Sequence, residues 1–122
     1  MSTIRGGSGG AIDNVSSTAA TLGSPHEYMH YAAAEAGVEA LTVGLAKELG
    51  EQGVRANAVA PGTVRAAIQA AVGDPDRLQR VLPRSPMGRA GEPDEIAPAI
   101  AWLLGAGSAY VTGATIRVAG GL

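Results

Sequence analysis

The sequence contains no cysteine, which excludes disulfides, thiol nucleophiles and thiolate metal sites. It also has no phenylalanine, one tryptophan and three tyrosines, so any core must be built from aliphatic side chains and alanine. The nine lysines and arginines are scattered and the net charge is −2, so we expect no nucleic-acid partner. These absences leave a globular protein without thiol chemistry.

Long hydrophobic runs are absent as well. No apolar run approaches the ~20 residues that span a bilayer, and the N-terminus lacks the charged and apolar regions of a signal peptide. We therefore expect a soluble, cytoplasmic protein with no membrane partner. The 122 residues, 46% hydrophobic and 16% charged, suffice for one domain. Residues 1–10, which are rich in glycine, are predicted to be a flexible lead-in, and residues 11–122 the domain.

The periodicity and the turn residues predict alternating strands and helices. Strands are expected where β-branched residues are bounded by glycine or proline, over residues 11–16, 54–60 and 114–119. A helix should begin at a capping box with Ser24 as N-cap, Pro25 after it and Glu27 completing it, and should end near Leu49. The second connection predicts helical pieces over residues 64–72, 76–82 and 93–104.

The order strand, helix, strand, helix, strand is a βαβαβ unit, in which right-handed crossovers lay the strands parallel. We predict an α/β fold with three parallel strands, equivalent to half of a Rossmann-like doubly wound sheet. The carboxyl ends of the strands then share one edge, which is where such folds bind ligands. Asp13 lies within the first strand, and a charge there leads us to expect an uncovered edge or face.

Four motifs follow one another along the chain: N-V-S-S at 14–17, Y-A-A-A at 31–34, R-A-N-A-V-A-P-G at 55–62 and Y-V-T-G at 110–113. From about Gly10 to Leu122, the chain resembles the C-terminal half of a short-chain dehydrogenase/reductase. The resemblance implies interconversion of an alcohol and a carbonyl with NAD or NADP. The glycine-rich turn that binds the cofactor's pyrophosphate belongs to the other half of that family's fold.

The resemblance also implies roles for particular residues. Ser17 would hydrogen-bond the substrate oxygen. Tyr31 would be the acid/base, because a hydride that leaves or reaches a carbon must be matched by a proton on the neighbouring oxygen. Contacts with the cofactor would come from five residues: Asn14, Pro61, Gly62, Thr63 and Val64.

The sequence departs from the family one helical turn after Tyr31, where the family has a lysine and this chain has Glu35. In the family, the lysine favours the phenolate and holds the nicotinamide ribose. A carboxylate opposes phenolate formation and has no hydrogen to donate. A second departure is Ala66, where the family commonly has a threonine. We therefore predict a fragment of an NAD(P)-dependent oxidoreductase that is non-catalytic or strongly impaired alone and that serves as a self-associating α/β scaffold.

Two other functions are compatible with the sequence. In a split enzyme, another chain would supply the nucleotide-binding half, and Ser17 and Tyr31 would act on a small-molecule substrate. In a zinc hydrolase, His26 and His30 would form the H-E-x-x-H pattern on one helix face, although Glu35 is the sole nearby candidate for a third ligand.

Self-association is expected to produce a homodimer or a higher homo-oligomer. The predicted helix carries an apolar stripe and a stripe of small residues, namely Leu41, Leu45 and Leu49 for the first and Ala36, Ala40 and Gly44 for the second. A twofold partner could pair along residues 11–16 or pack the small-residue stripe against its copy. In the family, the equivalent helix commonly packs against a neighbouring subunit.

Overall fold

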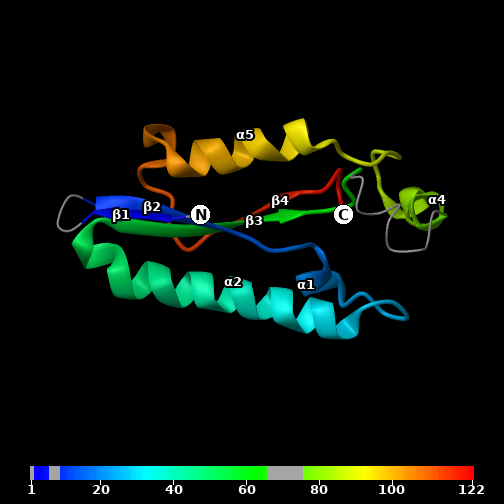
Figure 1. Ribbon diagram of the computed structural model, residues 1–122, viewed down its shortest axis with the longest axis horizontal. Helices are drawn as coiled ribbons and strands as arrows, with labels where there is room; N and C mark the ends of the chain where they lie inside the picture. Colours follow the sequence, from blue (N-terminus) through cyan, green and yellow to red (C-terminus); the bar gives the residue numbers. More distant parts are fainter. Residues whose placement is uncertain (1, 6–8, 66–75) are drawn as a thin grey trace.

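The computed structural model describes residues 2–5, 9–65 and 76–122. Four strands form one sheet in chain order (Figure 1): β1 Ser2–Arg5, β2 Gly9–Val15, β3 Val54–Pro61 and β4 Thr115–Val118. β2, β3 and β4 run parallel. The predicted parallel unit of three strands is therefore confirmed, with strand bounds that differ from the prediction by one or two residues at most ends.

β1 is a strand that the sequence did not predict. It runs antiparallel to β2, with Ser2 opposite Ile12 and Arg5 opposite Gly9. The glycine-rich lead-in thus includes a strand, while residues 6–8 lie outside the described residues. Because β1 occupies the outer edge of β2, the same chain already takes the strand edge that a second copy was expected to use.

Helices cover both faces of the sheet (Figure 1). The long helix α2, Met29–Leu49, lies on one face, and α5, Pro93–Leu104, lies on the other. The remaining elements are short: α1 Ala19–Leu22, α4 Arg77–Val81 and the 3-10 turns η1 Gly50–Gln52, η2 Leu82–Arg84 and η3 Ala106–Ser108. Within the described residues, no helix is both long enough and apolar enough to cross a membrane.

α5 has the bounds that the sequence predicts. A capping box of Glu92 and Glu95 starts the helix, and Gly105 follows its last residue. The piece predicted over residues 64–72 falls largely outside the described residues, and Ala66 lies there too.

The start of α2 differs from the prediction. Ser24 and His26 have left-handed backbone angles, φ 46° and φ 66°, so residues 24–28 form a turn and the helix begins at Met29. The N–H of Tyr28 donates to the Ser24 carbonyl at 3.2 Å, which closes the turn. The predicted capping box is wrong because Ser24 does not have the extended backbone of an N-cap, and the Glu27 carboxylate accepts from Arg77 instead.

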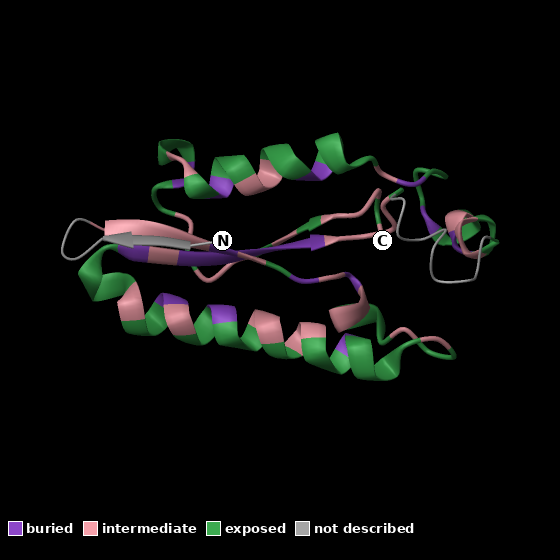
Figure 2. Cartoon of the chain, in the orientation of Figure 1, coloured by how far each residue is buried: buried purple, intermediate pink, exposed green. Residues whose placement is uncertain are grey.

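The core is aliphatic and rich in alanine, as predicted. β3 is the central strand and is buried on both faces (Figure 2). Val59 packs with Ile96 and Leu103 of α5. α2 turns small residues toward the sheet, Ala32, Thr42 and Ala46, whereas Leu41 of the predicted apolar stripe is 58% exposed.

Asp13 is buried, with 1% of its surface exposed, so the expectation of an uncovered charge there is wrong. Burial raises the pKa of the Asp13 carboxyl to about 6, and the charge of the N-terminus partly offsets this effect. The Asp13 carboxyl is therefore buried within the protein and does not lie at a solvent-exposed edge or face of the sheet.

Candidate functional site

The predicted catalytic serine lies where β2 leaves the sheet. The N–H of Thr18 donates to the Pro61 carbonyl at 3.0 Å, so the turn that carries Ser17 runs alongside the end of β3. The Ser17 hydroxyl accepts a hydrogen bond from the N–H of Ala19 at 3.1 Å, which fixes it at the start of α1. The predicted serine and the predicted cofactor loop thus share the carboxyl edge of the sheet.

Two side-chain hydrogen bonds tie this end of β2 to α2. The Ser16 hydroxyl donates to Glu39 Oε2 at 2.8 Å, and the Asn14 amide donates to Thr42 Oγ1 at 3.0 Å. Thr42 in turn donates to the carbonyl of Val38. Asn14, which the resemblance assigns to the cofactor, therefore already serves to join strand and helix.

Tyr31 lies in the first turn of α2, at the same edge. Its side chain is 44% exposed, and among the described residues its hydroxyl has no hydrogen-bond partner. Glu35 follows one turn later and Glu39 one turn after that. Since Glu39 reaches Ser16, Glu35 belongs to the inner face of α2, beyond the strand end. Its Oε2 is buried and accepts no hydrogen bond within the described residues.

The loop after β3 packs against the C-terminal tail. The N–H of Gly62 donates to the Val118 carbonyl at 3.0 Å, and a Cβ at Gly62 would come within 2.8 Å of the Ala119 Cβ, so the position requires glycine. Val64 packs against the core, so any contact that it makes with a cofactor would involve its backbone. Thr63 instead faces a pocket.

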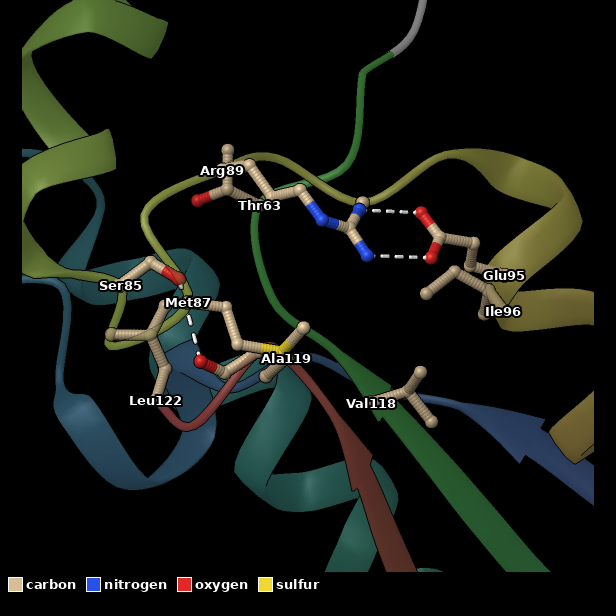
Figure 3. A pocket seen from close by; sticks show the side chains of 11 residues that line it. Thr63, Ser85, Met87, Arg89, Glu95, Ile96, Val118, Ala119 and Leu122 are labelled. Atoms are coloured by element: carbon tan, nitrogen blue, oxygen red, sulfur yellow. Dashed lines mark hydrogen bonds and ion pairs between the residues drawn. The ribbon is translucent and has the colours of Figure 1, made fainter.

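This pocket, of about 160 Å³, lies between the C-terminal tail and the N-terminus of α5 (Figure 3). Arg89 at its rim donates two hydrogen bonds to Glu95, at 2.7 and 2.8 Å. The guanidinium lowers the pKa of Glu95 to about 2. These two charges satisfy each other, and apolar side chains such as Ile96, Val118 and Met87 line much of the rest. The pocket therefore offers a small and mainly apolar space beside the cofactor loop.

The H-E-x-x-H pattern does not form the expected arrangement. His26 lies in the turn before α2 and His30 lies in the helix, so the prediction that they share one helix face is wrong. In the described ranges, histidine, aspartate and glutamate form no group of three or more that could hold a metal ion.

The sequence did not reveal the role of the polar residues in β3. The Arg55 guanidinium donates to the carbonyls of Gly105 and Val111 at 3.1 and 3.2 Å. The buried Asn57 amide donates to the Val111 carbonyl at 2.8 Å and accepts from the N–H of Ala114 at 3.0 Å. These bonds hold the connection from α5 to β4. Arg55 and Asn57 of the third motif therefore have a structural role in holding this connection, not a catalytic one.

Comparison with known proteins adds to this geometry. A family model described as enoyl-(acyl carrier protein) reductase matches residues 3–122. The uncharacterized oxidoreductase YgfF of Escherichia coli K12 is 49% identical over 121 residues, which are 99% of this chain and 49% of that protein. The chain thus spans about half the length of the curated relatives it matches.

Two solved structures share the arrangement. A 3-oxoacyl-[acyl-carrier protein] reductase from Brucella melitensis with bound NAD is 38% identical, with a TM-score of 0.82 over 92% of this chain and 40% of that one. An NADPH-bound short chain oxidoreductase from Pseudomonas aeruginosa PAO1, described as containing an atypical catalytic center, is 36% identical, with a TM-score of 0.76 over 92% of this chain and 45% of that one.

Proposed function

Because the chain belongs to the short-chain dehydrogenase/reductase family, we propose that it carries the substrate-facing part of an NAD(P)-dependent oxidoreductase site and that, alone, it is catalytically silent or strongly impaired. In this proposal, Ser17 binds the oxygen of an alcohol or carbonyl substrate, and Tyr31 exchanges the proton with it. The isolated chain then acts as a self-associating α/β scaffold.

The observation that carries the proposal is Glu35. Glu35 lies one helical turn from Tyr31. Its Oε2 is buried and accepts no hydrogen bond in the described part of the chain. A carboxylate there cannot supply the positive charge that the family's lysine places beside the tyrosine. It also supplies no hydrogen to a ribose hydroxyl oxygen.

The residues fit a nicotinamide cofactor in part. Pro61, Gly62 and Thr63 lie at the carboxyl edge of β3, where a doubly wound sheet receives such a ligand, and a bound nicotinamide would supply or accept the hydride. Glu35 does not fit, for the reason given above. The glycine-rich stretch also has the wrong place in the sequence for a phosphate loop, because it falls between β1 and β2 and not between a strand and a helix.

Direct binding tests the proposal. We would titrate NADH and NADPH into the purified chain and follow nicotinamide fluorescence, with the full-length E. coli relative as the matched control. We expect no saturable change for this chain. Saturable binding by the chain alone would refute the scaffold role. If turnover appeared after the chain was mixed with the nucleotide-binding half of the relative, the chain would instead be one part of a split enzyme.

Self-association is part of the proposal. The outer face of α2 carries exposed small or apolar residues, among them Ala40, Leu41 and Gly44, and the exposed charged residues Lys47 and Glu48 lie nearer its C-terminal end. A Cβ at Gly37 or Gly44 would meet nothing within 4 Å, so this face is open in a single chain. Small residues let two helices approach closely, and the face therefore suits a symmetric contact with a second copy.

A further inference from the structure

The outer edge of β2 carries a strand that runs opposite to the rest of the sheet (Figure 1). β2, β3 and β4 are parallel, whereas β1 is antiparallel to β2. Among the described strands, β1 has β2 as its one neighbour. β1 can therefore leave without separating the parallel strands.

The main-chain groups of β2 alternate between its two edges. The N–H groups of Gly10 and Ser16 donate toward β3, to carbonyls at 3.4 and 2.8 Å. Because neighbouring residues of a strand direct these groups to opposite edges, Ala11 directs its own toward β1. Thr3 lies opposite Ala11, so these two residues form a hydrogen-bonded pair. Ile4 lies opposite Gly10, so its main-chain groups point away from β2.

β1 covers part of this edge. Its register with β2 reaches Ile12, so Val15 lies beyond the described part of β1. By the same alternation, Val15 directs its main-chain groups toward this edge. The stretch of edge beyond β1 therefore adjoins the turn that carries Ser17, the candidate catalytic serine.

β2 is held in the sheet by contacts that do not involve β1. At its start, a Cβ at Gly9 would lie 2.9 Å from the Gly53 carbonyl oxygen, so the two backbones are in close contact. Toward its end, the side chains of Asn14 and Ser16 hydrogen-bond to α2. β1, by contrast, has four residues and one neighbouring strand. A strand this short, at the edge of a sheet, is easily released.

The position of β1 in the sheet indicates a partner. A doubly wound sheet consists of two βαβαβ halves, and the first strands of the two halves lie side by side. β2 is the first parallel strand of this chain and β3 takes one of its edges, so a second half would add at the edge where β1 lies. The relatives contain enough chain for such a half, since this chain spans 49% and 46% of two of them.

We propose that β1 blocks the edge of β2 that receives a parallel strand from a nucleotide-binding half, and that this half binds when β1 is released. The two strands cannot share the edge, because both need the main-chain groups of Ala11. The identity of the partner rests on the proposed function, whereas the release of β1 does not. The block by β1 adds to Glu35 as a reason why the isolated chain is silent.

Two proline variants test the release of β1. Thr3→Pro removes an N–H that faces Ala11, whereas Ile4→Pro, the matched control, removes one that faces away from β2, which an edge strand tolerates. In hydrogen exchange followed by NMR, we expect Thr3→Pro to speed exchange of the Ala11 amide by about tenfold and Ile4→Pro to change it much less. The Ile12 amide, which points toward β3, is the internal reference.

Two outcomes of the exchange experiment would overturn the release of β1. One is the same exchange rate at Ala11 in the natural chain and in Thr3→Pro. The other is equally faster exchange at Ile12, which would show that the parallel strands do not hold together without β1.

A disulfide that fixes β1 tests whether the edge is blocked. Ser2 and Ile12 lie opposite each other in a non-hydrogen-bonded pair, where side chains come closest. The chain has no cysteine of its own, so Ser2→Cys with Ile12→Cys introduces a single pair that holds β1 in place when oxidised and frees it when reduced. If mass spectrometry showed no disulfide after oxidation, the pairing of β1 with β2 would itself be refuted.

Co-purification measures binding of the partner. Each chain is co-expressed with the tagged nucleotide-binding half of the E. coli relative, and the cysteine variant is expressed in both a reducing and an oxidising cytoplasm. We expect Thr3→Pro to be recovered with this half about fivefold more than the natural chain or Ile4→Pro, because more of it has a free edge. The oxidised cysteine variant should not be recovered, and the reduced form should match the natural chain.

Equal recovery of Thr3→Pro and Ile4→Pro, or recovery of the oxidised cysteine variant, would overturn the block. Recovery of none of the chains would reject the nucleotide-binding half as the partner. A larger homo-oligomer of Thr3→Pro in its place would show that the edge receives a second copy. Because no readout uses a cofactor or turnover, an assembled but inactive complex would support both this proposal and the role of Glu35.

Discussion

The Ser16 hydroxyl donates to Glu39 Oε2 across 2.8 Å, and this bond links the strand that carries the candidate serine to the helix that carries the candidate tyrosine. Ser16 is 5% exposed, so its hydroxyl has little access to water as an alternative partner. The relative position of Ser17 and Tyr31 therefore depends on a contact that neither residue makes itself.

Replacing Glu39 by alanine should destabilise the protein by about 1–3 kcal/mol, because a buried hydroxyl loses a charged acceptor. Glu39→Gln keeps an acceptor oxygen and should cost less than about 1 kcal/mol. Urea unfolding measures both, and Lys47→Ala, an exposed change on the same helix, is the control. Equal losses for the alanine and glutamine variants would show that the hydrogen bond is not what matters at Glu39.

Asp13 should make stability depend on pH. Its pKa rises from 3.8 to about 6 on folding, chiefly through burial, so the folded state holds the proton more tightly than the unfolded chain. The stabilisation from this group is complete below about pH 3.8 and is lost as the pH rises through about 6. Asp13→Asn should therefore be the more stable form at pH 7.5, by on the order of 2 kcal/mol, and the difference should shrink toward pH 4. Chemical unfolding of both proteins across this range is the measurement, and a gap that does not vary with pH would contradict the assignment.

The sequence predicted those elements whose signals are local. α5 has its predicted bounds because Glu92, Glu95 and Gly105 mark both ends within a few residues. The carboxyl edge that gathers Ser17 with Pro61 follows from the parallel order of the strands.

The elements that were missed depend on distant partners. The capping signal at Ser24 does not start a helix, since Ser24 and His26 have left-handed backbone angles, and Glu27 pairs with Arg77, 50 positions away. The buried face of α2 was not decided by the sequence, since a helix that is apolar or small nearly all round has no single apolar stripe to choose. β1 pairs with the edge of β2 that would otherwise be unpaired. That edge exists only in the folded sheet, so the local sequence does not predict the pairing.

Glu35→Lys should not create an NAD(P)-dependent dehydrogenase from this chain. The change places a donor beside Tyr31, but within the described residues no glycine-rich turn leads from a strand into a helix to hold the pyrophosphate. We expect no reduction of NAD or NADP above background with a panel of secondary alcohols, measured at 340 nm. If the variant reduced either cofactor without a partner, contacts to the pyrophosphate would not be required for activity. Glu35 alone would then explain why the natural chain is inactive.

A twofold dimer through the outer face of α2 is the expected assembly. Ala40 lies on that face with Gly44 one turn away, and close contact between two such helices leaves no room for an indole. Ala40→Trp should therefore convert a dimer to a monomer in size-exclusion chromatography with light scattering, while unfolding shows that the chain itself stays folded. Ala97→Trp, on an exposed position of α5 on the other face of the sheet, is the matched control and should remain dimeric. A natural chain that stays monomeric at high concentration would refute self-association. A dimer unaffected by Ala40→Trp would move the contact elsewhere, and the outer edge of β4 is then the first candidate, because β1 already occupies the opposite edge of the sheet.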